Sequence, residues 1–175
     1  MELSNLILIG MPGAGKSTLG ILTAKALGLS FLDTDVAIQA QYGQTLSELI
    51  SRHGLEGFCR IEEEYLGNLN VRQTVIATGG SAVYYDGAMN HLKRTGRVVY
   101  LKVPLEILQS RLADMASRGV VIEPGQTLET LFKKRSGLYE RYADLIIPLA
   151  EQSHEQAVQA ILRRLQEKDG KEPIG

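Results

Sequence analysis

Short apolar runs alternate with amphipathic segments along the chain. The runs are rich in Val, Ile and Leu and are continuous rather than alternating with polar residues, which is typical of strands covered by helices on both faces. This pattern predicts an α/β fold with a mostly parallel sheet. The expected strands are Leu6–Ile9, Phe31–Leu32, Val75–Ala77, Val98–Leu101 and Leu145–Ile147.

The segments between these runs carry helix signals. Apolar residues recur at helical spacing from Ser17 to Leu27, and Gly28 follows as a stop. Two further helices are expected to begin with a capping box, in which side chain and backbone of residues three apart bond reciprocally. The pairs with this spacing are Thr45 with Glu48 and Ser153 with Gln156.

The chain of 175 residues is expected to form one domain over residues 1–168. Residues 115–126 contain Gly119, Pro124 and Gly125 with little periodicity. A loop of this length is typical of a functional lid or of a disordered segment. The tail, residues 169–175, is expected to be frayed.

Charge and cysteine content narrow the partners. The 19 basic and 20 acidic residues leave a net charge of -1, so nucleic acid and anionic membranes are not expected partners. The single cysteine, Cys59, excludes an internal disulfide, and the start of the chain lacks the basic region of a secretory signal. We expect a cytoplasmic monomer that binds small anionic ligands.

The run Gly10-Met-Pro-Gly-Ala-Gly-Lys-Ser17 matches the phosphate-binding loop pattern G-x-x-x-x-G-K-[ST] and follows an expected strand. Glycines let backbone N–H groups turn toward a polyphosphate, Lys16 adds charge, and Ser17 offers a hydroxyl to Mg²⁺. The loop predicts binding of a nucleoside triphosphate; the alternative is an ordinary glycine-rich turn.

Two carboxylates follow the second expected strand, in Asp33-Thr34-Asp35. Ligands of open α/β sheets bind at the carboxyl ends of the strands. One carboxylate can hold Mg²⁺, while the next but one, on the same side of an extended chain, can act as a general base. The alternative is that Asp35 serves only as a helix N-cap.

Paired glycines follow the third expected strand, in Thr78-Gly79-Gly80-Ser81. Glycine lets backbone approach a ligand closely, although a plain turn accounts for the pair equally well. These motifs carry a resemblance when they are combined with Phe58…Glu62 in G-F-C-R-I-E, Arg118, and Arg135…Tyr139 in R-S-G-L-Y.

In this order, from Leu6 to Ile147, the motifs resemble the shikimate kinase family. The resemblance implies a three-layer P-loop kinase fold similar to that of nucleoside monophosphate kinases. It also implies Mg²⁺-dependent transfer of the γ-phosphoryl group of ATP to the 3-hydroxyl of shikimate, a step in aromatic amino acid synthesis. Helices within residues 36–70 would form the acceptor side, and residues 115–126 would form the lid.

The resemblance also implies roles for single residues. Lys16 and Arg118 would steady the transferred phosphoryl group, and Asp35 would deprotonate the acceptor hydroxyl. Ser17 and Asp33 would hold the metal. The nucleotide would contact Gly13, Ala14, Gly15, Lys16, Ser17, Thr18 and Arg111, and the acceptor would contact Asp35, Cys59, Arg60, Gly79, Gly80, Ser81 and Arg135. From the residues alone, the three arginines at 111, 118 and 135 can equally be solvated surface charges.

The acceptor half departs from the family pattern at three positions. The family motif reads F-R-x-x-E, and Cys59 stands where its arginine clamps the acceptor carboxylate. Loss of a buried charged partner costs about 2–5 kcal/mol, and Arg60 lies roughly 100° further round the helix. Ser81 replaces a third glycine, and Gly119 replaces a proline of the lid. The alternative for Cys59 is a small apolar packing residue.

The sequence therefore predicts an ATP-dependent small-molecule kinase with shikimate as the leading acceptor. Another hydroxylated carboxylate or a polyol is the close alternative acceptor. A nucleotide-binding protein without kinase activity is the alternative from another class. A GTPase switch is disfavoured because the chain contains no N-K-x-D motif for guanine.

Overall fold

The computed structural model describes residues 5–113, 126–168 and 170. The expected lid and tail lie almost entirely outside this part of the chain. The described residues form a parallel five-stranded sheet in the order β2-β3-β1-β4-β5. Its strands are β1 (Asn5–Ile9), β2 (Ser30–Asp33), β3 (Thr74–Ala77), β4 (Gly96–Lys102) and β5 (Leu145–Pro148).

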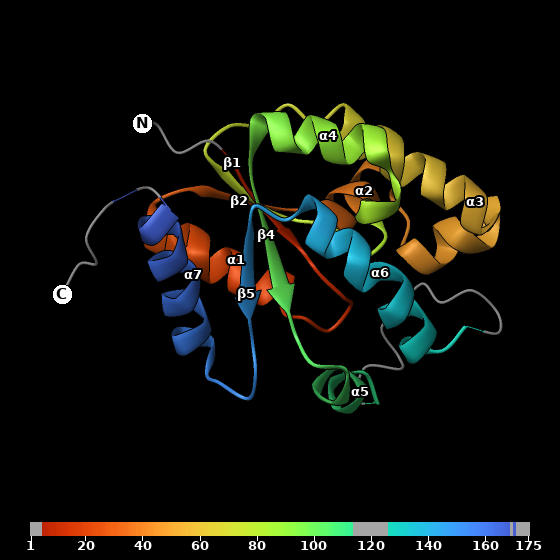
Figure 1. The fold of residues 1–175 in the computed structure, drawn as a ribbon. Helices are drawn as coiled ribbons and strands as arrows, with labels where there is room; N and C mark the ends of the chain where they lie inside the picture. The colour runs from red at the N-terminus through yellow and green to blue at the C-terminus, as the bar shows by residue number, and fades with distance from the viewer. Residues whose placement is uncertain (1–4, 114–125, 169, 171–175) are drawn as a thin grey trace.

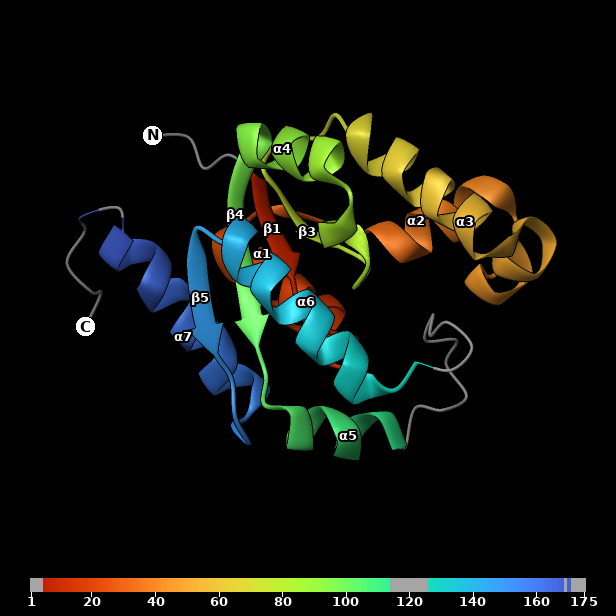
Figure 2. The same cartoon turned by 45° about the vertical axis from the view of Figure 1, so that its right-hand side comes forward.

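Helices connect successive strands and cover both faces of the sheet. Helices α1 and α7 pack together on one face, and α4 and α6 lie on the other, which gives three layers (Figures 1 and 2). The helices are α1 (Lys16–Leu27), α2 (Thr34–Tyr42), α3 (Leu46–Gly67), α4 (Asp86–Thr95), α5 (Leu105–Ala113), α6 (Leu128–Tyr142) and α7 (His154–Lys168), with a short 3₁₀ turn, η1, at Ala82–Tyr84.

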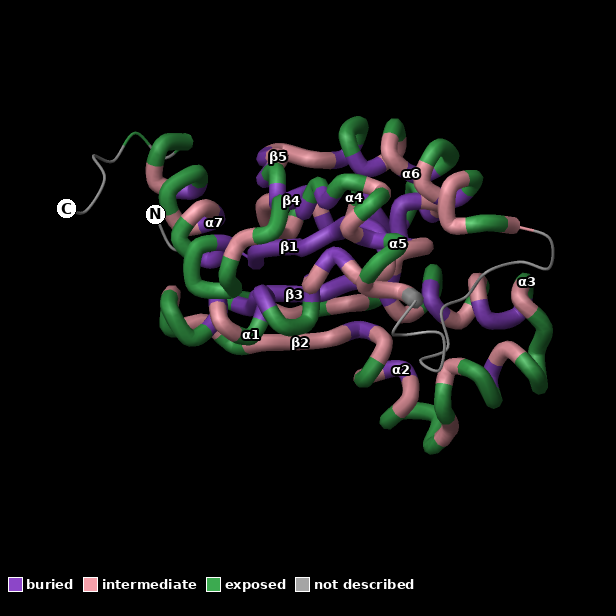
Figure 3. Tube along the Cα trace, turned by 90° about the horizontal axis from the view of Figure 1, so that it is seen from below, coloured by how far each residue is buried: buried purple, intermediate pink, exposed green. Residues whose placement is uncertain are grey.

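Burial explains why the strand sequences are continuous apolar runs. Every residue of β1 and of β3 is buried, and the buried positions of the tube form a band along the sheet (Figure 3). Parallel strands covered on both faces leave no position for alternating polar residues. The expected α/β fold is confirmed, and the sheet is parallel throughout the described residues.

A second, smaller core lies between α2 and α3, beyond the edge of the sheet (Figure 2). It is built from Ile38, Leu49 and Phe58, which are all buried. Helix α3 changes direction at Gly54, whose φ of 70° is not helical. This core sets the position of the two helices that follow β2, the first of which carries Asp35.

The expected helix boundaries agree closely with the structure. Gly28 ends α1 in the left-handed conformation, as expected of a helix C-cap. Both predicted capping boxes are formed, by Thr45 with Glu48 at the start of α3 and by Ser153 with Gln156 at the start of α7. None of the helices in the described part of the chain is long and apolar enough to cross a membrane.

The cap of α3 provides a test of local stability. Replacing Thr45 by Ala removes an acceptor for the Glu48 N–H, which we expect to lower the free energy of unfolding by about 0.5–2 kcal/mol. Urea denaturation measures the change. Glu63→Ala, at an exposed position of the same helix, is the matched control and should change stability by less than about 0.5 kcal/mol. Equal effects of the two substitutions would contradict the cap assignment.

Candidate active site

The carboxyl ends of β1, β2 and β3 lie side by side and carry the residues singled out in the sequence. Parallel registration aligns Leu8 with Ala77 and Ala77 with Asp33. The phosphate-loop sequence follows β1, Asp33 ends β2 with Asp35 two residues later, and the glycine pair follows β3, so all three lie at the same edge of the sheet. This edge is where ligands bind in open α/β sheets.

The phosphate loop turns sharply into α1. Gly15 occupies the N-cap of this helix with φ 89°, a conformation that glycine adopts without a steric cost. Lys16 is the first residue of the helix and is buried, and its Nζ donates hydrogen bonds to the Gly10 and Met11 carbonyl oxygens at 2.8 and 2.9 Å. The lysine ammonium is thus held inside the curve of the loop.

Burial lowers the pKa of Lys16 to about 8, an effect that the nearby Asp35 carboxylate partly offsets. The amine therefore remains protonated at neutral pH. A cation that is poorly solvated in this way interacts strongly with an anion that enters the loop. The N-terminus of α1 also favours the binding of an anion.

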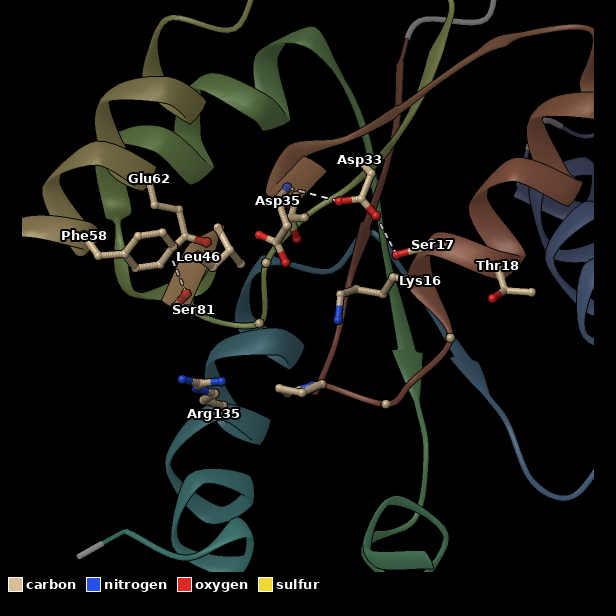
Figure 4. Close-up of a pocket in the computed structure, with 16 residues that line it drawn as sticks. Lys16, Ser17, Thr18, Asp33, Asp35, Leu46, Phe58, Glu62, Ser81 and Arg135 are labelled. Atoms are coloured by element: carbon tan, nitrogen blue, oxygen red, sulfur yellow. Dashed lines mark hydrogen bonds between the residues drawn. The ribbon is translucent and has the colours of Figure 1, made fainter. Parts of the chain in front are cut away.

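Asp33 connects the start of α1 with the start of α2. Its Oδ2 accepts a hydrogen bond from Ser17 Oγ at 2.6 Å, and its Oδ1 accepts from the backbone N–H of Asp35 (Figure 4). The same Oδ1 also accepts from the backbone N–H of Val36. Asp33 is therefore the N-cap of α2. The alternative that Asp35 is the cap is wrong: Asp35 lies in the first turn of the helix, not in an extended segment, and its carboxylate is free to face the cavity.

Asp35 lies close to the glycine pair after β3. A Cβ atom at Gly79 would stand 3.0 Å from Asp35 Oδ1 and would collide with the Glu62 carboxylate. Glycine is therefore required here for close approach of side chains. Burial, followed by the charge of Asp33, raises the pKa of Asp35, and a carboxylate with a raised pKa is a better general base at neutral pH.

Helix α6 contributes a buried guanidinium. Arg135 is 4% exposed, its Nε donates to the Tyr84 hydroxyl at 2.9 Å, and its guanidinium lies over the Tyr84 ring. Tyr139, one turn later on α6, donates to the Gly80 carbonyl oxygen at 2.7 Å. These contacts fix α6 against the glycine pair and orient Arg135.

These groups surround one cavity of about 370 Å³, within the range of small-ligand sites. In Figure 4, Lys16 and Asp35 approach it from α1 and α2, Glu62 from α3 and Arg135 from α6. The cavity is lined by Pro12, Gly13, Gly15, Lys16, Ser17, Thr18, Asp33, Asp35, Leu46, Phe58, Glu62, Thr78, Gly79, Gly80, Ser81 and Arg135. A phosphate loop thus shares a chamber with a carboxylate and a buried arginine.

Comparison with known proteins agrees with this geometry. The family model described as shikimate kinase matches residues 12–166. The chain belongs to the shikimate kinase family. Its relatives include shikimate kinases of Pseudomonas paraeruginosa, 40% identical over 92% of this chain and 95% of the relative, and of Histophilus somni, 39% identical over 87% and 89%.

A solved structure gives the same family assignment. The shikimate kinase of Acinetobacter baumannii in complex with shikimate has a TM-score of 0.88, with 34% identity over 97% of this chain and 96% of that one. The protein is therefore a small-molecule kinase with the P-loop kinase fold that the resemblance implied. The alternative of an ordinary glycine-rich turn at residues 10–17 is excluded with it.

Of the expected site residues that the structure describes, most line the cavity and four do not. Ala14, within the loop, is buried. Arg111 lies beside the loop and donates to the Gly13 carbonyl oxygen at 3.0 Å. Cys59 is half-buried and packs against the main core, which agrees with the alternative that it is a packing residue. Arg60 is exposed. Arg118 lies outside the described residues. Roles of these four residues and of Arg118 in catalysis or binding stay predictions.

Sequence reasoning missed Glu62 and Phe58 as lining residues, although both belong to the family motif. They stand four residues apart on α3 and therefore share a helix face. The signal that could have found them is a glutamate on the same face of the helix as an aromatic residue. Leu46 carried no comparable signal, because its place on the cavity wall depends on how α3 begins beside α2.

Glu62 is 1% exposed, and burial raises its pKa to about 7 despite hydrogen bonds from Ser81 and Tyr85. A folded-state pKa above the ordinary value of 4.5 means that the folded protein holds more protons between pH 4.5 and 7. The stability that protonated Glu62 provides is therefore present below this window and is lost as pH rises through it.

We expect Glu62→Gln to reduce this loss. Between pH 5 and pH 8 the free energy of unfolding should fall by up to about 3 kcal/mol more in the unmodified protein than in the variant. Urea denaturation at the two pH values measures both. Glu63→Gln, at the exposed neighbouring position, should keep the full pH dependence. Parallel pH profiles of the unmodified protein and Glu62→Gln would refute the pKa assignment.

Proposed function

We propose that the protein transfers the γ-phosphoryl group of ATP to a hydroxyl group of shikimate. The observation that carries this proposal is the placement of Asp35 and Arg135 on the cavity that the phosphate loop also lines. A triphosphate on the loop and a hydroxylated carboxylate between Asp35 and Arg135 would meet inside one chamber. The family membership supports the same reaction.

Lys16, the loop amides and the start of α1 would bind the phosphates of ATP. Mg²⁺ fits beside them, because Ser17 Oγ and Asp33 Oδ2 lie 2.6 Å apart and both are oxygen donors. Among the described residues, no cluster of three or more His, Cys, Asp and Glu side chains could hold a metal ion. This suits Mg²⁺, which commonly takes few protein ligands and completes its shell with phosphate and water, and which neutralises phosphate charge when bound.

Asp35 would act as the base. Its carboxylate accepts the proton of the acceptor hydroxyl while the hydroxyl oxygen forms a bond to the γ-phosphorus, and the bond from that phosphorus to the bridging oxygen of ADP breaks. Lys16 neutralises charge on the transferred group. Such a reaction depends mainly on positioning and charge neutralisation, which this cavity provides. Arg118 remains a predicted further contributor from the expected lid.

Arg135 would bind the acceptor carboxylate. The buried guanidinium is oriented through its Nε by Tyr84 and lines the cavity, and its planar arrangement suits a carboxylate. Cys59 supplies no second cation, and Arg60 is exposed away from the cavity lining. Another small hydroxylated carboxylate is therefore the competing acceptor.

An acceptor panel tests the function. ADP release in the presence of ATP and Mg²⁺ should be stimulated by millimolar shikimate more than by gluconate, quinate or glycerol. If one of the other compounds clearly stimulates ADP release and shikimate does not, that compound would replace shikimate as the proposed acceptor. ATP binding without stimulation by any acceptor would instead support a non-catalytic nucleotide-binding protein.

Lys16→Met tests the donor half. We expect kcat to fall about 10²- to 10³-fold or more, because a cation that acts on the charge of the transition state is removed. ATP affinity, measured by calorimetry, should fall less than kcat. Lys25→Met changes an exposed lysine on the same helix and should leave both quantities unchanged. Full activity of Lys16→Met would refute the assignment of the loop.

A further inference from the structure

The Glu62 carboxylate is held by two hydroxyl groups. Ser81 Oγ donates to its Oε2 at 2.6 Å, and the Tyr85 hydroxyl donates to the same oxygen at 2.9 Å. The other oxygen, Oε1, has no hydrogen-bond partner among the described residues. A Cβ atom at Gly79 would collide with Oε1, so this buried oxygen is packed against the glycine pair.

A buried carboxylate held only by neutral groups is unusual, because its charge is normally compensated by a cation. Within the described residues, Glu62 has no ion pair within 4.0 Å. Cys59 lies three residues earlier on α3, a spacing that places two side chains on the same helix face. Its thiol lies at the Tyr85 hydroxyl, where burial, Glu62 and Cys59 together raise the pKa of the tyrosine. The position from which a cation could reach Glu62 along the helix therefore holds an uncharged side chain.

We propose that Ser81 is a positioning residue that, with Tyr85, holds the Glu62 carboxylate against the glycine pair on the acceptor side of the cavity, in place of a cation at position 59. The inference rests on the proposed function, because its consequence is a change in acceptor binding. Ser81 fixes one carboxylate oxygen, and the other, Oε1, packs against Gly79, so the carboxylate sets the position of the glycine pair that lines the cavity.

Several charged groups face Glu62 from the elements around it. Asp35 on α2 favours its protonated form, whereas Arg135 on α6 and Lys16 on α1 favour its ionised form. The hydrogen bonds from Ser81 and Tyr85 also favour the ionised form. Loss of the Ser81 donor should therefore move ionisation of Glu62 to higher pH.

Kinetics of Ser81→Ala test the proposal. We expect the KM for shikimate to rise about 10-fold, with the KM for ATP unchanged, because a hydrogen bond to a charged group is removed on the acceptor side only. The acid limb of kcat/KM for shikimate should move to higher pH. Asp35 also contributes to this acid limb, so the effect of Ser81 is the difference between the pH profiles of the variant and of the unmodified protein. Ser81→Thr, which retains a hydroxyl, should recover most of the change.

Testing Ser81→Ala together with a substitution at Cys59 separates a positioning role from a general disturbance of the structure. Cys59→Arg places a guanidinium one helical turn from Glu62, so adding Ser81→Ala there should raise the KM for shikimate only about 2-fold. The matched control is Cys59→Ala, which supplies no cation and should preserve the full 10-fold effect of Ser81→Ala. Equal effects of Ser81→Ala in the arginine and alanine backgrounds would overturn the proposal, as would an unmoved acid limb.

A readout without acceptor distinguishes this inference from the proposed function. Ser81→Ala should steepen the fall in the free energy of unfolding between pH 5 and pH 8, and adding Glu62→Gln should abolish that change. An unaltered pH dependence overturns the role of Ser81 whatever the acceptor is. If shikimate fails to stimulate ADP release while the steeper pH dependence is found, the proposed acceptor fails and the hydroxyl-held Glu62 stands. Tyr85→Phe, which removes the other donor, gives the same test if Ser81→Ala does not fold.

Discussion

The carboxylate of Asp33 holds the site together. One of its oxygens caps α2, and the other accepts a hydrogen bond from the first turn of α1. The donor and acceptor halves of the cavity follow different strands, and this side chain sets the distance between them. Because Asp33 caps α2, the next carboxylate, Asp35, is not needed to accept hydrogen bonds from the backbone N–H groups of that helix. Asp35, the proposed base, and Asp33, the proposed metal ligand, can therefore lie two residues apart without competing for the same contacts.

Two cationic and three acidic side chains meet in the cavity, and several of them are partly removed from water. Lys16 and Arg135 face Asp33, Asp35 and Glu62, and burial shifts the pKa values of Lys16 and Glu62. Desolvation lowers the pKa of the lysine and raises those of Asp35 and Glu62, so all three groups titrate nearer to neutrality than usual. Binding of a polyphosphate and a divalent cation would change every one of these equilibria together, because the groups interact through a medium of low dielectric.

The sequence predicted the donor half well because its signals are local. The phosphate loop and the capping boxes are short patterns whose geometry depends on neighbouring residues, and the continuous strands report burial on both faces. The acceptor half depends on contacts between distant segments. Nothing near Ser81 in the chain indicates that its hydroxyl meets Glu62, nineteen residues earlier. Likewise, Asp35 was considered as a cap because the local pattern did not show that Asp33 already fills that position.

The separation between the two hydrophobic cores has an evolutionary consequence. The loop, α1 and the sheet rest on the large core, whereas Leu46 and Phe58, which line the acceptor side, belong to the small cluster between α2 and α3. Substitutions that reshape the acceptor wall therefore need to be accommodated by only a few neighbours. A lineage can drift at Leu46 and Phe58 while its nucleotide machinery stays under unchanged selection. New substrate preferences can arise in such a scaffold without a passage through unfolded intermediates.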